Sequence, residues 1–242
     1  VELNICPLRT PWNSSFLIIA RDIREKRRQI EELRQASRNQ QIVNSILQIA
    51  LEDFSLDEIL QRSLEYVLLL NTPKLLDKGA VLLVDNDSDH LLLKAHKGFD
   101  RYHLAACRRI PFGTCHCGRA ALTGDIQFSE CVNHGHDIRL AEMAPHGHYC
   151  VPICSGENLL GVLSLYLQEG HVQNDEEQST LWAVSNILAG VIERKKAEIQ
   201  RSQLIKKQEA MITRIFDEQN LTESIIESLN AGLMVFDPER NV

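Results

Sequence analysis

The fold is decided by the stretch YCVPICSGENLLGVLSLY, which spans residues 149–166. Two apolar runs, 149–153 and 159–166, flank the polar sequence SGEN at 155–158. Glycine and asparagine favour tight turns, whereas β-branched and aromatic residues favour strands. The stretch therefore predicts two antiparallel strands joined by a hairpin turn.

Further elements around this hairpin complete the pattern of an α+β domain. The apolar runs 79–85 and 90–96 flank a turn of Asn, Asp and Ser, and they predict a second hairpin. Helical patterns, with apolar residues every three or four positions, occupy 22–52, 55–70 and 174–219. We expect an antiparallel sheet with helices on one face and an irregular segment across the other.

Three motifs in the middle of the chain carry a family resemblance. A glycine-rich segment and turn at 113–125 precede Val151-Pro152-Ile153 and the sequence GENLLGVL at 156–163. This order resembles the GAF domain pattern. The resemblance implies a GAF-like sensor domain at 38–195, with its ligand pocket between the sheet and the segment 98–150. Domains of this family are sensing modules for small molecules, cofactors or redox state, and few are enzymes.

The two flanks resemble pieces of PAS domains. The strand-to-helix sequence Phe16–Arg28 is similar to the end of a PAS domain, and Leu221–Val242 is similar to the opening of the next one. The chain starts at Val1 and stops in what reads as a strand, so we expect a slice of a multidomain bacterial PAS/GAF sensor of the histidine kinase or diguanylate cyclase type. Its output domain would lie elsewhere in the full-length chain, since no output motif is present here. The expected division is a PAS end at 1–24, a linker helix at 25–50, the GAF-like domain at 38–195, a coiled-coil-like linker helix at 196–220 and a PAS start at 221–242.

Composition excludes several classes of protein. The formal charge is −7, from 33 acidic and 26 basic residues, which argues against a nucleic-acid binder. No apolar run is long enough to cross a bilayer, so we expect no membrane segment in this piece. Seven cysteines in a chain of 242 residues do not resemble a small disulfide scaffold, which favours a reducing, cytoplasmic location.

Cysteine and histidine concentrate in the segment that should wall the pocket. Six of the seven cysteines and five of the nine histidines lie between Cys107 and Cys154. The sequences HGH at 134–136 and 146–148 each place two imidazoles two residues apart. Alternate residues of an extended chain point the same way, so each pair can address one site.

Thiolates together with imidazoles suit iron, zinc or an iron–sulfur cluster. We expect the ligands to be Cys115, Cys117, Cys131 and Cys150, and the alternates are His116, His146 and His148. The spacing C-x-C-x13-C-x18-C matches no zinc-finger pattern. If no metal binds, the same cysteines act in thiol redox sensing or only in packing, and the pocket holds an unknown small ligand.

Other uses of these residues are open at this point. The Cys115-His116 doublet is similar to the bilin attachment site of some GAF photoreceptors, but it lies too far from the strand at 151–153. A small-molecule or nucleotide-binding GAF module with structural cysteines is one alternative, and a thiol-based reductase of free methionine sulfoxide is another. We expect Cys107 and Cys154 to be buried small hydrophobic residues rather than ligands. The remaining histidines of the domain, namely His90, His96, His103 and His171, should be ordinary surface residues.

Together these observations predict a non-enzymatic signal-input module. Redox state, a gas or metal occupancy at the Cys/His site would change how the helix at 23–49 packs on the helix at 181–215. In a parallel homodimer the flanking helices would also form the dimer interface.

Overall fold

The computed structural model of the 242-residue chain describes residues 2–10, 13–70, 74–85, 88–132, 136–138 and 143–232. The first two strands, β1 (Glu2–Thr10) and β2 (Asn13–Arg21), pair only with each other, as an antiparallel hairpin. The chain divides into two compact units, Val1–Ile192 and Glu193–Val242.

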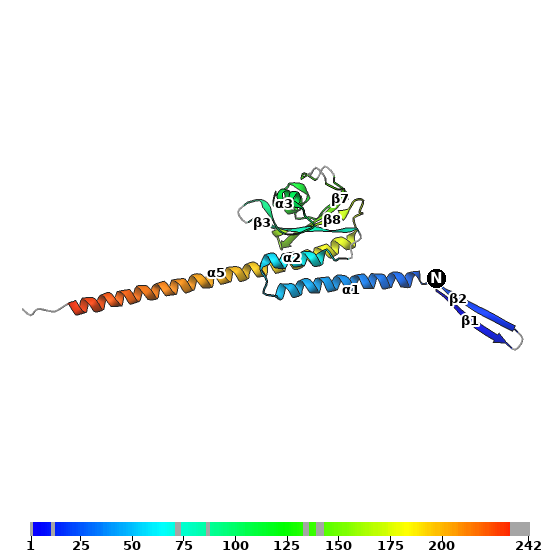
Figure 1. Ribbon diagram of the computed structural model, residues 1–242, viewed down its shortest axis with the longest axis horizontal. Helices are drawn as coiled ribbons and strands as arrows, with labels where there is room; N and C mark the ends of the chain where they lie inside the picture. The colour runs from blue at the N-terminus through cyan, green and yellow to red at the C-terminus, as the bar shows by residue number, and fades with distance from the viewer. Residues whose placement is uncertain are drawn as a thin grey trace, which may run out of the picture. The chain divides into compact units, whose positions relative to one another are not determined.

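A six-stranded antiparallel sheet forms the centre of the first unit (Figure 1). Its order is β5-β4-β3-β8-β7-β6, so the two predicted hairpins lie next to each other through β3 and β8. The hairpin at 149–166 is confirmed, with Ser155 opposite Asn158 at its turn. The strands are β3 (Leu75–Val84), β4 (His90–Lys97), β5 (Arg109–Pro111), β6 (Gln127–Ser129), β7 (His146–Ser155) and β8 (Asn158–Gln168).

Helices cover one face of this sheet, as expected. They are α1 (Arg24–Leu51), α2 (Leu56–Val67) and the first part of α5 (Asp175–Gly232). Ser55 and Glu58 form a capping box that starts α2, because each side chain accepts from the backbone N–H of the other. The core between helices and sheet consists of fully buried side chains, among them Ile46, Leu60, Leu64, Val81, Tyr149, Val151, Leu163, Val184 and Leu188.

The opposite face carries a smaller apolar cluster. Here α3 (Arg101–Cys107), α4 (Cys115–Thr123) and the segment 136–138 lie across the sheet. Figure 1 shows α3 on the side of the sheet away from α2. The buried residues are Ala80, Leu82, Leu91, Ile110, Ala120, Ala121, Cys150 and Val162. This second layer contains the candidate site.

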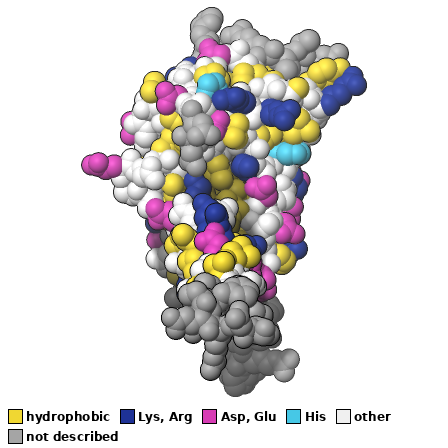
Figure 2. All heavy atoms as spheres, turned by 90° about the vertical axis from the view of Figure 1, so that its left-hand side faces the viewer, with side chains coloured by type: hydrophobic (Ala, Val, Ile, Leu, Met, Phe, Trp, Pro, Cys, Tyr) yellow, Lys and Arg dark blue, Asp and Glu magenta, His cyan; other side chains and the backbone are white. Residues whose placement is uncertain are grey.

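Helix α5 is longer than the sequence pattern indicates. It runs for 58 residues, whereas we expected an end near residue 219. Apolar side chains between Leu181 and Ile192 pack in the core, but the described side chains of 199–229 are exposed. Within the described residues, no helix combines the length and the apolar character that crossing a bilayer requires. On the face drawn in Figure 2, acidic and basic side chains are mixed rather than gathered into a field of one sign.

Short elements were missed by the sequence patterns. Three residues each in β5 and β6 are too few for a periodic signal, and α3 has only seven residues. The strand in which the sequence reads as stopping, at 233–237, lies outside the described residues.

Candidate functional site

Strand β7 supplies side chains to both faces of the sheet. Its residues are buried from His146 to Val151, so the strand has no solvent-facing side there. Tyr149 and Val151 belong to the core under the helices, whereas Cys150 belongs to the cluster on the opposite face. His148 lines the cavity on that same face. The twofold alternation of a strand therefore places His146, His148 and Cys150 on one side, as the sequence predicts.

A small cavity of about 20 Å³ lies between the sheet and α4. That volume is enough for one water molecule or an ion, but not for an organic ligand without movement of its walls. The lining combines thiols, imidazoles and apolar side chains: Ala80, Leu82, Phe99, Cys107, Ile110, Cys115, His116, Cys117, His136, Ile138, His148, Cys150, Ser164 and Tyr166.

Two cysteines from different elements meet at this cavity. The Sγ atoms of Cys117, on α4, and Cys150, on β7, are 3.5 Å apart, and Ser164 Oγ is 3.6 Å from Cys150 Sγ. The hydrogen bond from Cys150 lowers the pKa of the Cys117 thiol. The same hydrogen bond, together with burial, raises the pKa of Cys150 well above its usual value. Cys117 is therefore the more readily ionised member of the pair.

The start of α4 is held in an unusual conformation. Cys115 has a φ of 58°, in the left-handed region that side chains other than glycine seldom adopt. Its backbone N–H donates to the carboxylate of Asp137, and Arg119 pairs with the same carboxylate at 3.2 Å. These interactions tie the segment 136–138 to α4.

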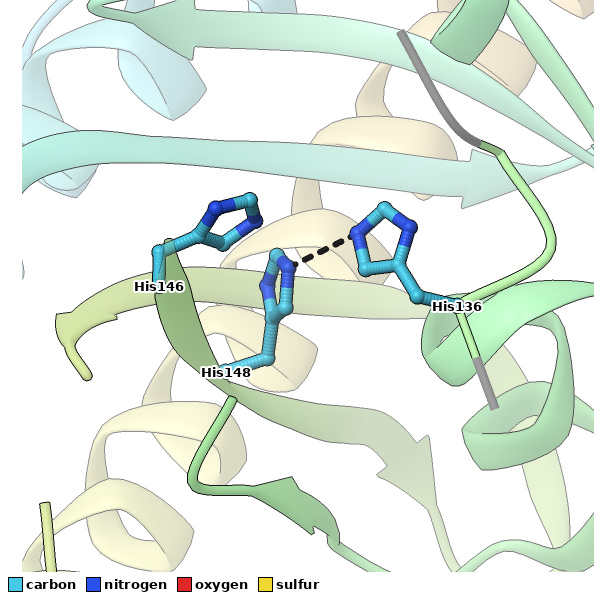
Figure 3. A group of neighbouring side chains, drawn as sticks. All are labelled: His136, His146 and His148. Carbon is cyan, nitrogen blue, oxygen red and sulfur yellow. Dashed lines mark hydrogen bonds between the residues drawn. The ribbon is translucent and has the colours of Figure 1, made fainter. Parts of the chain in front are cut away.

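Three histidines converge on one another (Figure 3), and two of them, His136 and His148, line the same cavity as the cysteine pair. One ring nitrogen each from His136, His146 and His148 lies within 4.8 Å of the others, and all three residues are buried. The Nε2 atoms of His136 and His148 are 3.1 Å apart. Burial is the main cause that lowers the pKa of His146, and it lowers that of His148 well below the usual value. Both imidazoles are therefore neutral at neutral pH, which is the form that binds metal ions.

Tyr166 forms the floor under these rings. Its ring centroid lies 4.9 Å from that of His146 and 4.3 Å from that of His148. The ammonium group of Lys78 lies 4.6 Å from the centroid of the Tyr166 ring, and its Nζ contacts His103 Nε2 at 2.8 Å. On the other side of the His103 ring, Nδ1 contacts Asp100 Oδ1, also at 2.8 Å. A polar chain thus runs along the edge of the histidine cluster.

The structure brings together only part of the expected ligand set. Cys115, Cys117 and Cys150 line one cavity, but Cys131 is not among the lining residues. Cys131 follows β6, where its carbonyl accepts a hydrogen bond from Ser129 Oγ. Within the described residues, the group that offers metal-ligating atoms at close range is formed by histidines and includes none of these four cysteines.

The three histidines expected as alternate ligands lie near one another. His146 and His148 belong to the histidine group, and His116 lines the cavity, with its ring centroid 5.9 Å from that of His148. His134 lies outside the described residues. Among the histidines that we expected on the surface, His103 and His171 are buried instead. Each has an acidic partner, Asp100 for His103 and Glu177 for His171, which explains how an imidazole can be accommodated there.

Sequence reasoning missed His136 as a ligand candidate, as well as the roles of Lys78, Ser164 and Tyr166. The HGH repeat at 134–136 and 146–148 was a signal for His136, because it matches the spacing of the pair on β7. No comparable signal existed for Tyr166, which reaches the site only because β8 pairs with β7 and places it opposite His148.

Comparison with known proteins identifies the domain. A sequence profile described as the GAF domain matches residues 55–193. No curated protein matches the chain. Among solved structures, the GAF domain of a phosphoenolpyruvate-protein phosphotransferase from Coxiella burnetii has a TM-score of 0.58 at 21% identity, covering 67% of this chain and 97% of that one.

Two further structures are similar to the same extent. Free methionine-R-sulfoxide reductase from Neisseria meningitidis, in complex with its substrate, has a TM-score of 0.56 at 20% identity, covering 66% of this chain and 91% of that one. A protein from Burkholderia vietnamiensis described as a GAF sensor has a TM-score of 0.55 at 19% identity, covering 66% of this chain and 97% of that one. At such identities the similarity concerns the fold alone.

Proposed function

Because this chain belongs to the GAF domain family, we propose that it is the signal-input region of a bacterial signal-transduction protein. In this proposal the domain senses redox state, a gas or a metal through the cysteine and histidine side chains of its cavity. It relays the change through α1 and α5 to an output domain in the same full-length chain. The protein would act in the cytoplasm, and the chain itself would not be an enzyme.

The observation that carries this proposal is the composition of the cavity. Cys115, Cys117 and Cys150 share one small buried space with His116, His136 and His148. A pocket built for an organic ligand is much larger, about 300–1,000 Å³. Thiols and imidazoles in a space of about 20 Å³ instead suit the chemistry of ions, small gases and electrons.

The cysteine pair can be oxidised to a disulfide by a peroxide. A peroxide oxidises the Cys117 sulfur, the Cys150 sulfur then attacks it, and one S–S bond forms. Two protons and two electrons leave the thiols, and hydrogen peroxide becomes two water molecules. The sulfur atoms must approach from 3.5 Å to about 2.05 Å, so the reaction would pull α4 toward β7.

Strand β7 offers a route from the cavity to α5. Tyr149, between His148 and Cys150, donates its hydroxyl to Glu177 at 3.3 Å and accepts from the backbone N–H of Asn174 at the start of α5. Glu177 is buried and also contacts His171 at 2.7 Å. A shift of β7 would therefore move a buried polar cluster at the beginning of the helix, and α5 would carry the change onward.

The flanking elements fit a place within an array of sensor domains. The antiparallel hairpin β1–β2 runs into α1, as the end of a PAS domain would, and residues 221–242 would begin the next PAS domain. Beyond Ile192, α5 exposes apolar side chains, including Ile205, Ile212, Ile215, Ile226 and Leu229. We propose that these residues form a parallel homodimer interface with a second copy of the chain.

A second candidate is reduction of free methionine sulfoxide by the cavity cysteines. The pair Cys117 and Cys150 favours it, because such a reductase needs two thiols that can form a disulfide. The size of the cavity argues against it, since an amino acid does not fit in about 20 Å³. The same argument applies to a nucleotide ligand. An assay with free methionine sulfoxide and a thiol reductant distinguishes a reductase, which turns over, from a sensor, which does not.

The experiment that tests the sensing proposal is chemical analysis of protein purified without oxygen. Iron with acid-labile sulfide and visible charge-transfer absorption would indicate a cluster, and iron or zinc without sulfide would indicate a mononuclear site. Reversible formation of a Cys117–Cys150 disulfide would indicate thiol sensing. The variants Cys117→Ser and Cys150→Ser should abolish the cluster or the disulfide, while Cys154→Ser, which lies outside the cavity lining, should not. Protein without metal, sulfide or reversible thiol oxidation would overturn the proposal.

A further inference from the structure

The three histidines beside the cavity are arranged around a common point. His146 and His148 extend from the same side of β7, and His136 reaches them from the segment 136–138 (Figure 3). Their nearest ring nitrogens lie within 4.8 Å of one another. The three rings come from two separate parts of the chain, and all are buried. Buried polar groups need polar partners, and here the rings face one another.

The distances match those around a metal ion. Zinc binds imidazole nitrogen at about 2.0–2.1 Å, so two ligands of one ion are separated by roughly 2.9 Å at a right angle and roughly 3.3 Å at the tetrahedral angle. The Nε2 atoms of His136 and His148 form a hydrogen bond at 3.1 Å (Figure 3), a distance that also lies between these values. The nearest ring nitrogen of His146 lies within 4.8 Å of both, so binding of one ion would draw the His146 ring closer to the other two.

The hydrogen bonding of His146 prepares one nitrogen to be a ligand. Its Nδ1 lies 2.6 Å from the carbonyl oxygen of Ala144, and since a carbonyl can only accept, Nδ1 carries the proton. The other nitrogen, Nε2, then has a bare lone pair. It is buried and has no hydrogen-bond partner among the described residues. A backbone carbonyl that fixes the ring while the opposite nitrogen binds the ion is the usual arrangement around metal-binding histidines.

The surroundings decide the class of ion. Three imidazole ligands select transition metals such as Zn²⁺, Co²⁺ or Fe²⁺ over Mg²⁺ and Ca²⁺, which require oxygen ligands. The neighbouring cavity of about 20 Å³ leaves room for one water or a small diatomic ligand at a further coordination position. Three protein ligands with one open position are typical of metal sites that bind an exchangeable ligand.

We propose that His136, His146 and His148 bind one divalent transition-metal ion, with an open coordination position that faces the cavity. The proposal rests on the proposed sensing function and specifies which side chains hold the ion. It differs from the ligand set that the sequence predicts, because the three protein ligands are imidazoles. The thiols of Cys117 and Cys150 lie across the cavity as a separate redox pair.

The test is titration of the full 242-residue chain, after treatment with a chelator, with Co²⁺ under reducing conditions. Visible ligand-field absorption reports the ligands of Co²⁺, and calorimetry with Zn²⁺ gives the affinity. We expect one ion per chain. His146→Ala, His148→Ala and His136→Gln should each weaken binding by at least about 100-fold, because removal of a direct ligand exceeds the effect of a lost outer partner. The matched controls His90→Asn and His96→Asn should bind like the original protein.

The outcomes separate this inference from the proposed function. Binding that survives His148→Ala and His136→Gln, but is lost in Cys117→Ser and Cys150→Ser, would overturn the three-histidine site and support sensing through cysteines. Failure of the unaltered chain to bind Co²⁺ or Zn²⁺ would overturn the inference, while the disulfide measurement still decides the sensing proposal. Circular dichroism and thermal unfolding of each variant identify a loss of binding that is due to misfolding.

If a variant misfolds, X-ray absorption of the Co²⁺-loaded original chain decides. A shell of sulfur ligands would contradict the site, and a shell of imidazole nitrogens would support it.

Discussion

Gly118 holds helix α4 against the strand that carries Pro111. A Cβ atom built on Gly118 would collide with the carbonyl oxygen of Pro111, which belongs to the backbone and cannot rotate away. Because Gly118 has no side chain, α4 can approach this backbone closely, and Cys117 is the neighbouring residue on the same helix. Close packing of this kind is one of the few reasons for a glycine inside a helix, where it is otherwise destabilising.

We expect Gly118→Ala to lower the free energy of unfolding by about 1–3 kcal/mol, the usual effect of overpacking. It should also separate the Cys117 and Cys150 sulfur atoms and slow their oxidation. Urea unfolding and the rate of disulfide formation measure the two effects. Gly190→Ala is the matched control, because a Cβ at that helical position meets nothing within 4 Å. This control should be stabilised by about 0.5–1 kcal/mol, and equal behaviour of the two variants would contradict the packing argument.

Asp100 makes the stability of the domain depend on pH. Its carboxylate accepts hydrogen bonds from the backbone and side chain of His103 and from the backbone of Tyr102, and these lower its pKa to about 2. A folded-state pKa below the unfolded value of about 3.9 adds stability that is fully present above that value. This stability is lost as the pH falls toward 2.

Denaturant unfolding between pH 5 and pH 2.5 tests this contribution. In Asp100→Asn the fall in stability over this range should be smaller than in the original chain, because the amide does not titrate. Asp125→Asn, an exposed position after α4, should keep the original pH dependence. An unchanged slope in Asp100→Asn would show that the carboxylate does not link folding to protons.

The sequence predicts the position of a site residue only where local spacing determines which face of the sheet its side chain occupies. His146, His148 and Cys150 alternate on one strand, so the sequence places them on one face. Cys131 could not be placed in the same way, because it follows a strand of three residues with no periodic pattern. Lys78, Tyr166 and Ser164 reach the site through strand pairing that joins distant parts of the chain, which no local pattern encodes.

Elements with strong patterns were predicted well. The two long hairpins and the helices α1 and α2 follow from alternation, turn residues and apolar spacing. The exposed half of α5 is different, because it buries no core-facing stripe that would fix its length within one chain. A helix of this length with exposed apolar residues gains stability from a partner.

We expect Ile212→Glu to weaken dimerisation of the chain. Ile205, Ile212 and Ile226 lie on one seven-residue grid along α5, and their exposed fractions are 43%, 67% and 51%. A buried charge in such a seam is strongly unfavourable, so the variant should be monomeric at concentrations where the original chain is dimeric. Analytical ultracentrifugation measures this change. Thr213→Glu, on the adjacent face, is the control and should remain dimeric; the same mass for both variants would contradict this interface.

In the whole molecule, strand β7 connects the cavity on one face of the sheet to the helices on the other. The sheet is only one layer thick, and β7 contributes side chains to both sides. Cys150 and His148 face the cavity, while Tyr149 contacts the first turn of α5 through Asn174 and Glu177. Tyr149, which contacts α5, is thereby the direct chain neighbour of two residues that line the cavity.

The coupling between cavity and helix is tested most directly by hydrogen exchange across α5 with Cys117 and Cys150 reduced and then oxidised. The account predicts a change in exchange at 175–192 that continues into 193–232, in the original chain and in Cys154→Ser, and no change in Cys117→Ser. Oxidation that alters exchange around α4 but leaves the whole of α5 unchanged would contradict it.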